Sequence, residues 1–196
     1  MESQNKNKTE QGRTRSYSDD SAYMQAGLMA ERIAMAWLRS RPEVHAVCDM
    51  RLNEQFQKRG VDFEVVFKNG DVEGVDVKHD THLGKSDRVL FEVLRVNHLS
   101  PSMRAGVLGW GFRSDANYFV FWAPAVTKLY ICNVDKMREC VQKFAKEQQG
   151  KVTVRWIATD ELKSTLVMLI PWDKCKEAFK IFDVPESMVE AARNDG

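Results

Sequence analysis

Residues 59–80, RGVDFEVVFKNGDVEGVDVKHD, constrain the fold most, because two alternating stretches flank a turn signal. Successive side chains of a strand point to opposite faces. Val75 and Val77 therefore share one face, and Asp76 and Lys78 share the other. The preceding stretch, residues 61–67, alternates valine or phenylalanine with mostly acidic residues in the same way. The sequence predicts an antiparallel hairpin with one apolar face and one charged face.

The length of the connecting loop decides which charged side chains meet across this hairpin. A two-residue Asn-Gly loop would turn the two charged rows to opposite faces, because a shift of one residue exchanges the faces of a strand. A three-residue loop over residues 69–71 pairs Asp62 with Lys78 and Glu64 with Asp76. It also keeps both apolar rows on the core side, so we expect the longer loop.

The rest of the chain shows alternating helical and strand patterns. A helix is expected from Ser21 to Arg41, ended by Pro42, with Glu31 in its middle. Further strands are expected at residues 44–51, 88–96, 117–123, 128–134, 151–157 and 164–172, and helices at 136–149, capped by Asp135, and from Asp173. We expect an antiparallel meander through strand 88–96, a short helix, a further strand, and C-terminal strand and helix additions. The predicted class is α/β, with a mixed sheet flanked by helices.

Composition and length favour one folded domain. The chain has 196 residues, of which 43% are hydrophobic. Residues 1–19 are predicted to be a disordered polar tail, residues 20–185 a single domain, and residues 186–196 a polar C-terminal tail.

Charge, cysteines and apolar runs exclude several classes of protein. The net charge of +1 provides no overall field to attract nucleic acid, so a polyanion would need a local patch or a bound metal. The four cysteines form no CxxC pair, which argues against a zinc ribbon and against a disulfide framework. The sequence shows neither a membrane-spanning apolar run nor a secretory signal, and a cytoplasmic location is the prediction.

The charged face of the hairpin carries the candidate chemistry. Carboxylates placed close together resist joint ionisation unless a cation neutralises them. Mg²⁺ suits a cleft that offers two or three carboxylates and is open to a substrate phosphate. Such a site would stabilise in-line displacement at phosphorus. The alternative is a solvated strand face with cross-strand salt bridges, each contributing about 0.2–1 kcal/mol.

VDFEVVF and VDVK, with a glutamate in the upstream helix LMAERIAMAWL, resemble the motifs of the PD-(D/E)XK nuclease superfamily. This superfamily has the restriction-endonuclease-like fold and includes Holliday junction resolvases and transposon end-cleaving subunits. The resemblance covers about residues 21–123, and Val61 occupies the position of the name-giving proline. It implies an αβββαβ core.

The resemblance also implies roles for individual residues. Asp62 and Asp76 would be metal ligands, the backbone carbonyl of Val77 a further ligand, and Glu31 a direct or outer ligand. Lys78 would act on the attacking water or the transition state. Mg²⁺ would be the cofactor, with Mn²⁺ as an alternative. Together, Asp62, Asp76, Lys78 and Glu31 are the expected catalytic set.

The expected partner is DNA. The segment between residues 85 and 113 is rich in cations that would hold phosphates, and the candidates are Lys85, Arg88, Arg104 and Arg113. Solvated loop charges are the alternative interpretation. Within the same segment, Glu92 is expected at the surface, and Trp110 is a candidate for base stacking. Residues 79–82, just before it, are expected in an ordinary loop.

The predicted function is hydrolysis of phosphodiester bonds by a metal-dependent nuclease, most simply a DNA endonuclease. The alternative is a catalytically inactive subunit with this fold, which binds nucleic acid or protein in a mobile-element or defence complex. A homodimer or a partner subunit is compatible with either hypothesis.

Overall fold

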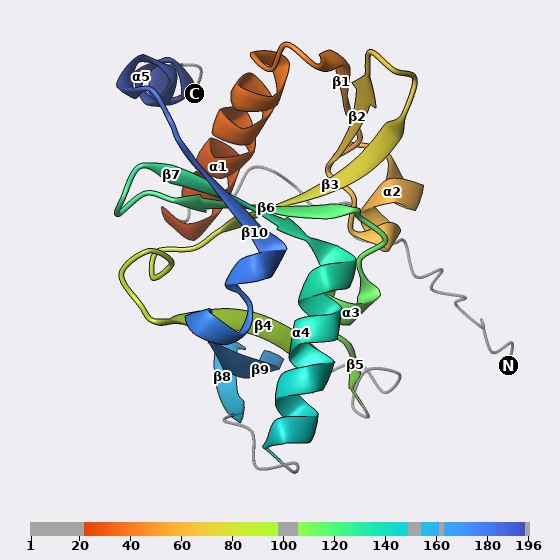
Figure 1. The fold of residues 1–196 in the computed structure, drawn as a ribbon, viewed down its shortest axis with the longest axis vertical. Coiled ribbons are helices and arrows are strands. Elements are labelled where there is room, and N and C mark those ends of the chain that lie inside the picture. Colours follow the sequence, from red (N-terminus) through yellow and green to blue (C-terminus); the bar gives the residue numbers. More distant parts are fainter. Residues whose placement is uncertain (1–21, 98–105, 149–153, 161–162, 195–196) are drawn as a thin grey trace, which may run out of the picture.

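The computed structural model describes residues 22–97, 106–148, 154–160 and 163–194, which form an α/β structure around a mixed sheet flanked by helices (Figure 1). Within these residues the main sheet has six strands. In spatial order they are β1 (Val44–Asp49), β2 (Phe63–Phe67), β3 (Val72–His79), β6 (Tyr118–Ala123), β7 (Lys128–Asn133) and β10 (Phe179–Asp183). β6 runs parallel to β3, and the other neighbouring pairs are antiparallel.

A second sheet lies below the main sheet in Figure 1. Its spatial order is β5 (Val107–Leu108), β4 (Arg88–Asn97), β9 (Lys163–Pro171) and β8 (Val154–Asp160), all antiparallel. The prediction that β4 extends the meander is therefore wrong. β6 occupies the edge of β3 where β4 was expected, and Val89 and Phe91 of β4 are buried in the core between the sheets.

The two faces of the main sheet belong to two apolar cores. On one face, β-strand residues pack with α1 (Ala22–Arg39) and α5 (Glu186–Asn194). On the other face they pack with α4 (Val134–Glu147) and the second sheet. β6 has both faces covered, which explains its unbroken apolar sequence. None of the described helices is long and apolar enough to cross a bilayer.

Three short helical segments and the C-terminus differ from the sequence prediction. Residues between β1 and β2 form α2 (Glu54–Arg59), which was not anticipated. The helix expected from Asp173 is instead two 3-10 turns, η2 (Trp172–Lys174) and η3 (Lys176–Ala178), followed by β10. Asn133, not Asp135, caps α4, since its Oδ1 accepts a hydrogen bond from the Lys136 N–H at 2.9 Å.

The C-terminal segment assigned to a polar tail contains α5. Val189 and Ala192 occur three residues apart on this helix and are buried against α1. Short amphipathic segments depend on such packing, because their intrinsic helix propensity is too weak to hold them alone. The expected N-terminal tail, residues 1–19, lies outside the described residues.

The hairpin between β2 and β3 has an odd-numbered loop, as predicted, but the register differs. The loop is residues 68–70, closed by the Phe67 N–H, which donates to the Asp71 carbonyl at 2.8 Å. Gly70 adopts a φ of 94°, a conformation that favours glycine. Glu64 therefore pairs with Gly74, not with Asp76. The pairing is displaced by two residues, which preserves the faces, so both charged rows still share one side of the sheet.

Candidate active site

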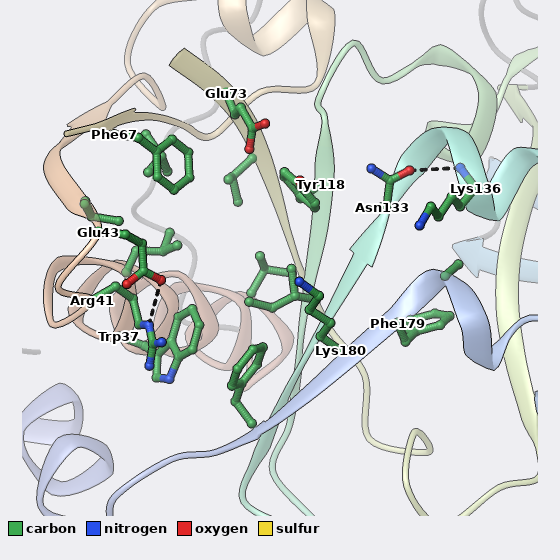
Figure 2. A pocket seen from close by; sticks show the side chains of 18 of the residues that line it. Trp37, Arg41, Glu43, Phe67, Glu73, Tyr118, Asn133, Lys136, Phe179 and Lys180 are labelled. Carbon is green, nitrogen blue, oxygen red and sulfur yellow. Dashed lines mark hydrogen bonds and ion pairs between the residues drawn. The ribbon is translucent and has the colours of Figure 1, made fainter. Parts of the chain in front are cut away.

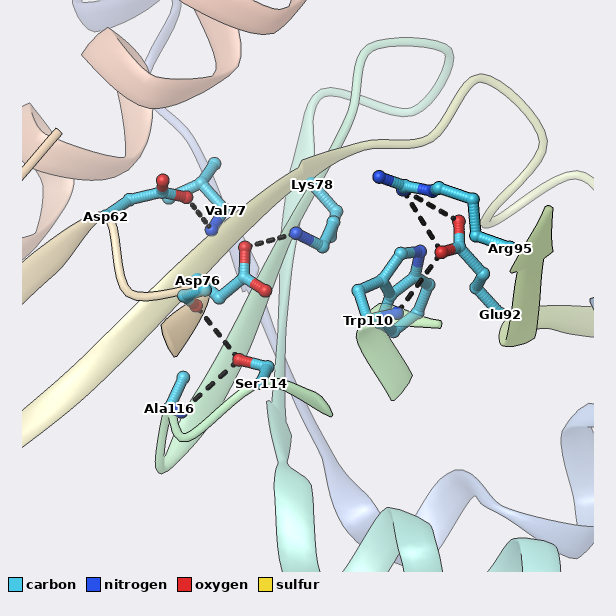
Figure 3. A network of polar contacts seen from close by, with 10 residues as sticks. Asp62, Asp76, Val77, Lys78, Glu92, Arg95, Trp110, Ser114 and Ala116 are labelled. Atoms are coloured by element: carbon cyan, nitrogen blue, oxygen red, sulfur yellow. Dashed lines mark hydrogen bonds and ion pairs between the residues drawn. The ribbon is translucent and has the colours of Figure 1, made fainter. Parts of the chain in front are cut away.

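The candidate site lies on β3, beside α3 (Trp110–Arg113), as Figure 3 shows. Val75 and Val77 point into the core under α1. Asp76 and Lys78 pair in register with Phe119 and Phe121 of β6. Both phenylalanines belong to the core on the opposite face of the sheet. The alternation of residues 74–78 thus places the carboxylate and the ammonium on one face, as the sequence predicted.

Asp76 is the most deeply buried charged side chain of the site, with 2% of its surface exposed. Its Oδ1 contacts the ammonium of Lys78, whereas its Oδ2 is buried and has no hydrogen-bond partner. Burial raises the pKa of Asp76 to about 7, opposed by Lys78 and reinforced by the nearby Asp62 carboxylate. A buried acceptor without a partner is costly, and the lone pairs of this oxygen can accept a hydrogen bond or bind a cation.

Asp62 lies immediately before β2 and continues the ladder towards β3. Its N–H donates to the Val75 carbonyl at 2.8 Å, and its Oδ2 accepts from the Val77 N–H at 2.8 Å. This second bond fixes the carboxylate beside Asp76 (Figure 3). Asp62, not Glu64, is consequently the acid next to Asp76. Val77 has its side chain in the core and contributes its backbone to the site.

Glu31 approaches from α1, on the opposite side of the sheet from Asp76. Burial raises the pKa of Glu31, and the Asp62 carboxylate raises it further. Asp62 therefore lies in the electrostatic range of both acids, so we infer that the carboxylates form a row and not one compact cluster. The role of Glu31 as a metal ligand beside the hairpin acids therefore stays a prediction, and Asp62 is the hairpin acid whose charge acts on it.

Arg51 is a residue of this site that the sequence analysis missed. Its Nη1 donates to Glu31 Oε2 at 2.7 Å, and its Nε and Nη2 contact Asp49 at 2.8 and 2.5 Å. A buried helix carboxylate needs a cationic partner. No local pattern, however, shows which of the chain's arginines would reach Glu31.

The site has donors that fit Mg²⁺, although not in a finished arrangement. Across the described residues, no group of three or more His, Cys, Asp or Glu side chains is placed to hold a metal ion. The unpartnered Oδ2 of Asp76 and the adjacent Asp62 supply the hard, anionic oxygens that Mg²⁺ prefers. The residues present therefore fit the ion as a site of two carboxylates. Glu31 is paired with Arg51 and is not one of them.

A tightly packed Gly-Trp-Gly turn supports Lys78. The Lys78 Nζ lies 5.5 Å from the Trp110 ring centroid, within range of a cation–π interaction. Gly109 and Gly111 lie so close to β4 that a Cβ on either would be 2.5 Å from an atom of Glu92 or Phe91, respectively. Trp110 packs edge-on against two aromatic rings of the core and tilted against a third, so it forms a wall of the site and is not an exposed stacking platform.

Glu92 is buried, contrary to the expectation of a surface residue. It is 6% exposed, pairs with Arg95 at 3.1 Å, and accepts from the Trp110 N–H at 3.2 Å (Figure 3). This acceptor replaces the missing side-chain cap at Gly109, the N-cap of α3. Glu92 therefore positions Trp110.

The expected DNA-binding cations are peripheral in the described structure. Lys85, Arg88 and Arg113 are exposed, and Arg88 pairs with Asp87 at 3.7 Å. Arg104 lies outside the described residues. His79 ends β3 and pairs with Trp122 of β6. Residues 80–82 form the loop that follows, as expected, and Asp80 Oδ1 accepts from the His82 and Leu83 N–H groups.

Two of the cavities among the described residues lie elsewhere, and neither is lined by Asp62 or Asp76. A groove of 280 Å³ lies on the α1 side of the sheet and is lined by Val75 and by aromatic side chains, among them Trp37, Phe67 and Tyr118 (Figure 2). Its rim has acids and bases in balance, namely Glu43, Glu73, Glu177, Arg41, Lys136 and Lys180. This balance favours neither an anionic nor a cationic ligand. A second cavity of 200 Å³ includes His79, whose pKa burial lowers.

Comparison with known proteins supplies no relative. No protein-family model, curated protein or solved structure matches the chain significantly.

Proposed function

We propose that the protein is a divalent-metal-dependent nuclease, most simply a DNA endonuclease that hydrolyses phosphodiester bonds. One observation carries the proposal: a buried, unpartnered carboxylate oxygen of Asp76 lies beside Asp62 and Lys78. A purely structural salt bridge would not require a second acid next to a carboxylate that is already costly to ionise.

The order of elements supports a restriction-endonuclease-like core. α1, β1, β2, β3, α3 and β6 occur in the order αβββαβ, and β6 runs parallel to β3. β4 and β5 are inserted between β3 and α3, and α2 between β1 and β2. These insertions enlarge the core without changing the order of the strands that carry the acids.

In the proposed reaction, Asp62, Asp76 and the Val77 carbonyl would hold Mg²⁺, with Mn²⁺ as an alternative ion. Glu31, which lies beyond Asp62, would be an outer ligand. The bound ion would supply Lewis-acid stabilisation of the charge that develops on the phosphate. Lys78, held between Asp76 and the Trp110 ring, would orient the attacking water and stabilise the transition state. The water oxygen bonds to phosphorus as the bond to the leaving oxygen breaks. The water loses a proton to solvent, and the leaving oxygen takes up a proton from solvent.

The substrate side of the proposal depends on exposed cations. Lys85, Arg88 and Arg113 are accessible to phosphates, and Arg104 belongs to the same proposed set. Such contacts would position DNA without reading its sequence. A cytoplasmic location and assembly with a second copy or a partner subunit complete the proposal.

Plasmid cleavage tests this function. Supercoiled DNA is incubated with the protein and Mg²⁺ or Mn²⁺, alongside Asp76→Ala and Lys78→Ala. We expect both variants to lose at least about 100-fold in rate. Asp87→Ala and Lys58→Ala, which alter exposed charges of the same types, are matched controls that retain cleavage. Equal cleavage by the wild type, Asp76→Ala and Lys78→Ala would remove the proposed chemistry.

A second candidate function is a nuclease-fold subunit that binds nucleic acid or protein without catalysis. The observation that favours it is the pairing of Glu31 with Arg51, which leaves two carboxylates at the site. Calorimetry separates the two functions: DNA binding without any heat of Mn²⁺ binding would favour the inactive subunit.

A further inference from the structure

Arg51 forms a bridge between an acid of the candidate site and an acid outside it. Glu31 and Arg51 are both mostly buried, each with 19% of its side-chain surface exposed. Their contact of 2.7 Å is a charge-assisted hydrogen bond. Glu31 is thus occupied by a cation of the chain itself.

The Arg51 guanidinium is fixed independently of Glu31. Asp49 accepts from Nε and Nη2 in a side-on pair, and its Oδ1 also accepts from the Arg51 backbone N–H at 3.1 Å. The guanidinium also lies 5.4 Å from the centroid of the Phe63 ring. Because these contacts do not involve Glu31, the guanidinium keeps its place when Glu31 changes partner.

We propose that Arg51 is a positioning residue that holds Glu31 in an ion pair while no metal is bound, and that it competes with the metal for the Glu31 carboxylate. The inference deepens the proposed function and rests on it. A dication must share or displace the Arg51 contact to recruit Glu31, so the ion pair within the chain competes with metal binding. Arg51 thereby weakens metal binding and prevents an unpaired buried acid in the metal-free protein.

Calorimetric titration with Mn²⁺, without DNA, tests the proposal. We expect Arg51→Met to bind Mn²⁺ about fivefold more tightly than the wild type, because Glu31 loses the contact that competes with the metal. In the Glu31→Gln background the same substitution should change the affinity less than about twofold, because the competition acts through Glu31. Arg39→Gln, which removes an exposed cation near Asp49, is the matched charge control and should have little effect.

Each outcome decides a different point. Unchanged or weaker Mn²⁺ binding by Arg51→Met would overturn the role of Arg51 while leaving the metal site in place. An equal change in both backgrounds would reduce its effect to bulk charge and also overturn the proposal. Absence of binding to all variants would remove the metal site itself. If Arg51→Met does not fold, Arg51→Lys serves instead. Lysine keeps the charge but loses the guanidinium that bonds Asp49 and Glu31 together, and the gain in Mn²⁺ affinity should be smaller than fivefold.

Discussion

Replacing Asp76 by asparagine would remove a buried charge while nearly preserving side-chain shape. Asp76 is 2% exposed, and one of its two oxygens has no partner. Lys78 has 24% of its side-chain surface exposed and can direct its ammonium to solvent in the variant. We therefore expect Asp76→Asn to fold and to be more stable than the metal-free wild type at alkaline pH.

The pH dependence follows from the pKa of Asp76, which burial raises from 3.8 to about 7. At a pH below the ordinary pKa of 3.8, the carboxyl is protonated in both the folded and the unfolded chain and does not affect stability. Between the two values only the folded chain keeps the proton, so stability falls as pH rises. Above about 7 both states are ionised and the cost is complete. From about pH 5 to about pH 8 the free energy of unfolding should fall by roughly 2–3 kcal/mol more in the wild type than in Asp76→Asn.

Urea denaturation in EDTA at several pH values measures this difference. At about pH 8, adding Mg²⁺ should then stabilise the wild type in proportion to the logarithm of its concentration and leave Asp76→Asn unchanged. Parallel pH profiles for the two proteins would refute the assignment of a costly buried charge. A Mg²⁺ effect of equal size in both would refute the role of Asp76 as a ligand.

Four further substitutions test the packing around the site and at the surface. Gly111→Ala puts a Cβ 2.5 Å from the Phe91 ring and should lower the free energy of unfolding by about 2–4 kcal/mol in urea denaturation. Gly27→Ala in α1, where a Cβ meets nothing within 4 Å, should raise it by up to about 1 kcal/mol. Equal effects of the two substitutions would contradict the close approach of α3 to β4. Val189→Asp in α5 should cost about 3 kcal/mol or more, because the side chain is 3% exposed; an unchanged unfolding midpoint would restore the polar-tail prediction. Trp156→Ser in β8 should change stability by less than about 0.5 kcal/mol, since Trp156 is 57% exposed. A larger loss, with a smaller particle by light scattering, would indicate that β8 is covered by a second copy.

Local pattern was sufficient to predict which side chains of β3 share a face. The period of two in residues 74–78 separates Asp76 and Lys78 from the valines whatever the surrounding fold, because it follows from strand geometry. The helical spacing of apolar residues around Glu31 and the unbroken apolar run of β6 predicted α1 and β6 for similar reasons. The odd loop length also followed, since only an odd loop keeps both apolar rows on the core side.

Contacts between distant residues required the tertiary structure. The exact register of the hairpin, the transfer of β4 to a second sheet and the packing of α5 depend on which surfaces bury one another. The burial of Glu92 under the Trp110 turn and the pairing of Arg51 with Glu31 are of the same kind. Alternation along one strand determines which way a side chain points, because neighbouring residues are covalently linked. What that side chain then meets is decided by segments far away in the chain, and only their packing made Asp76 a buried acid with one oxygen unpartnered.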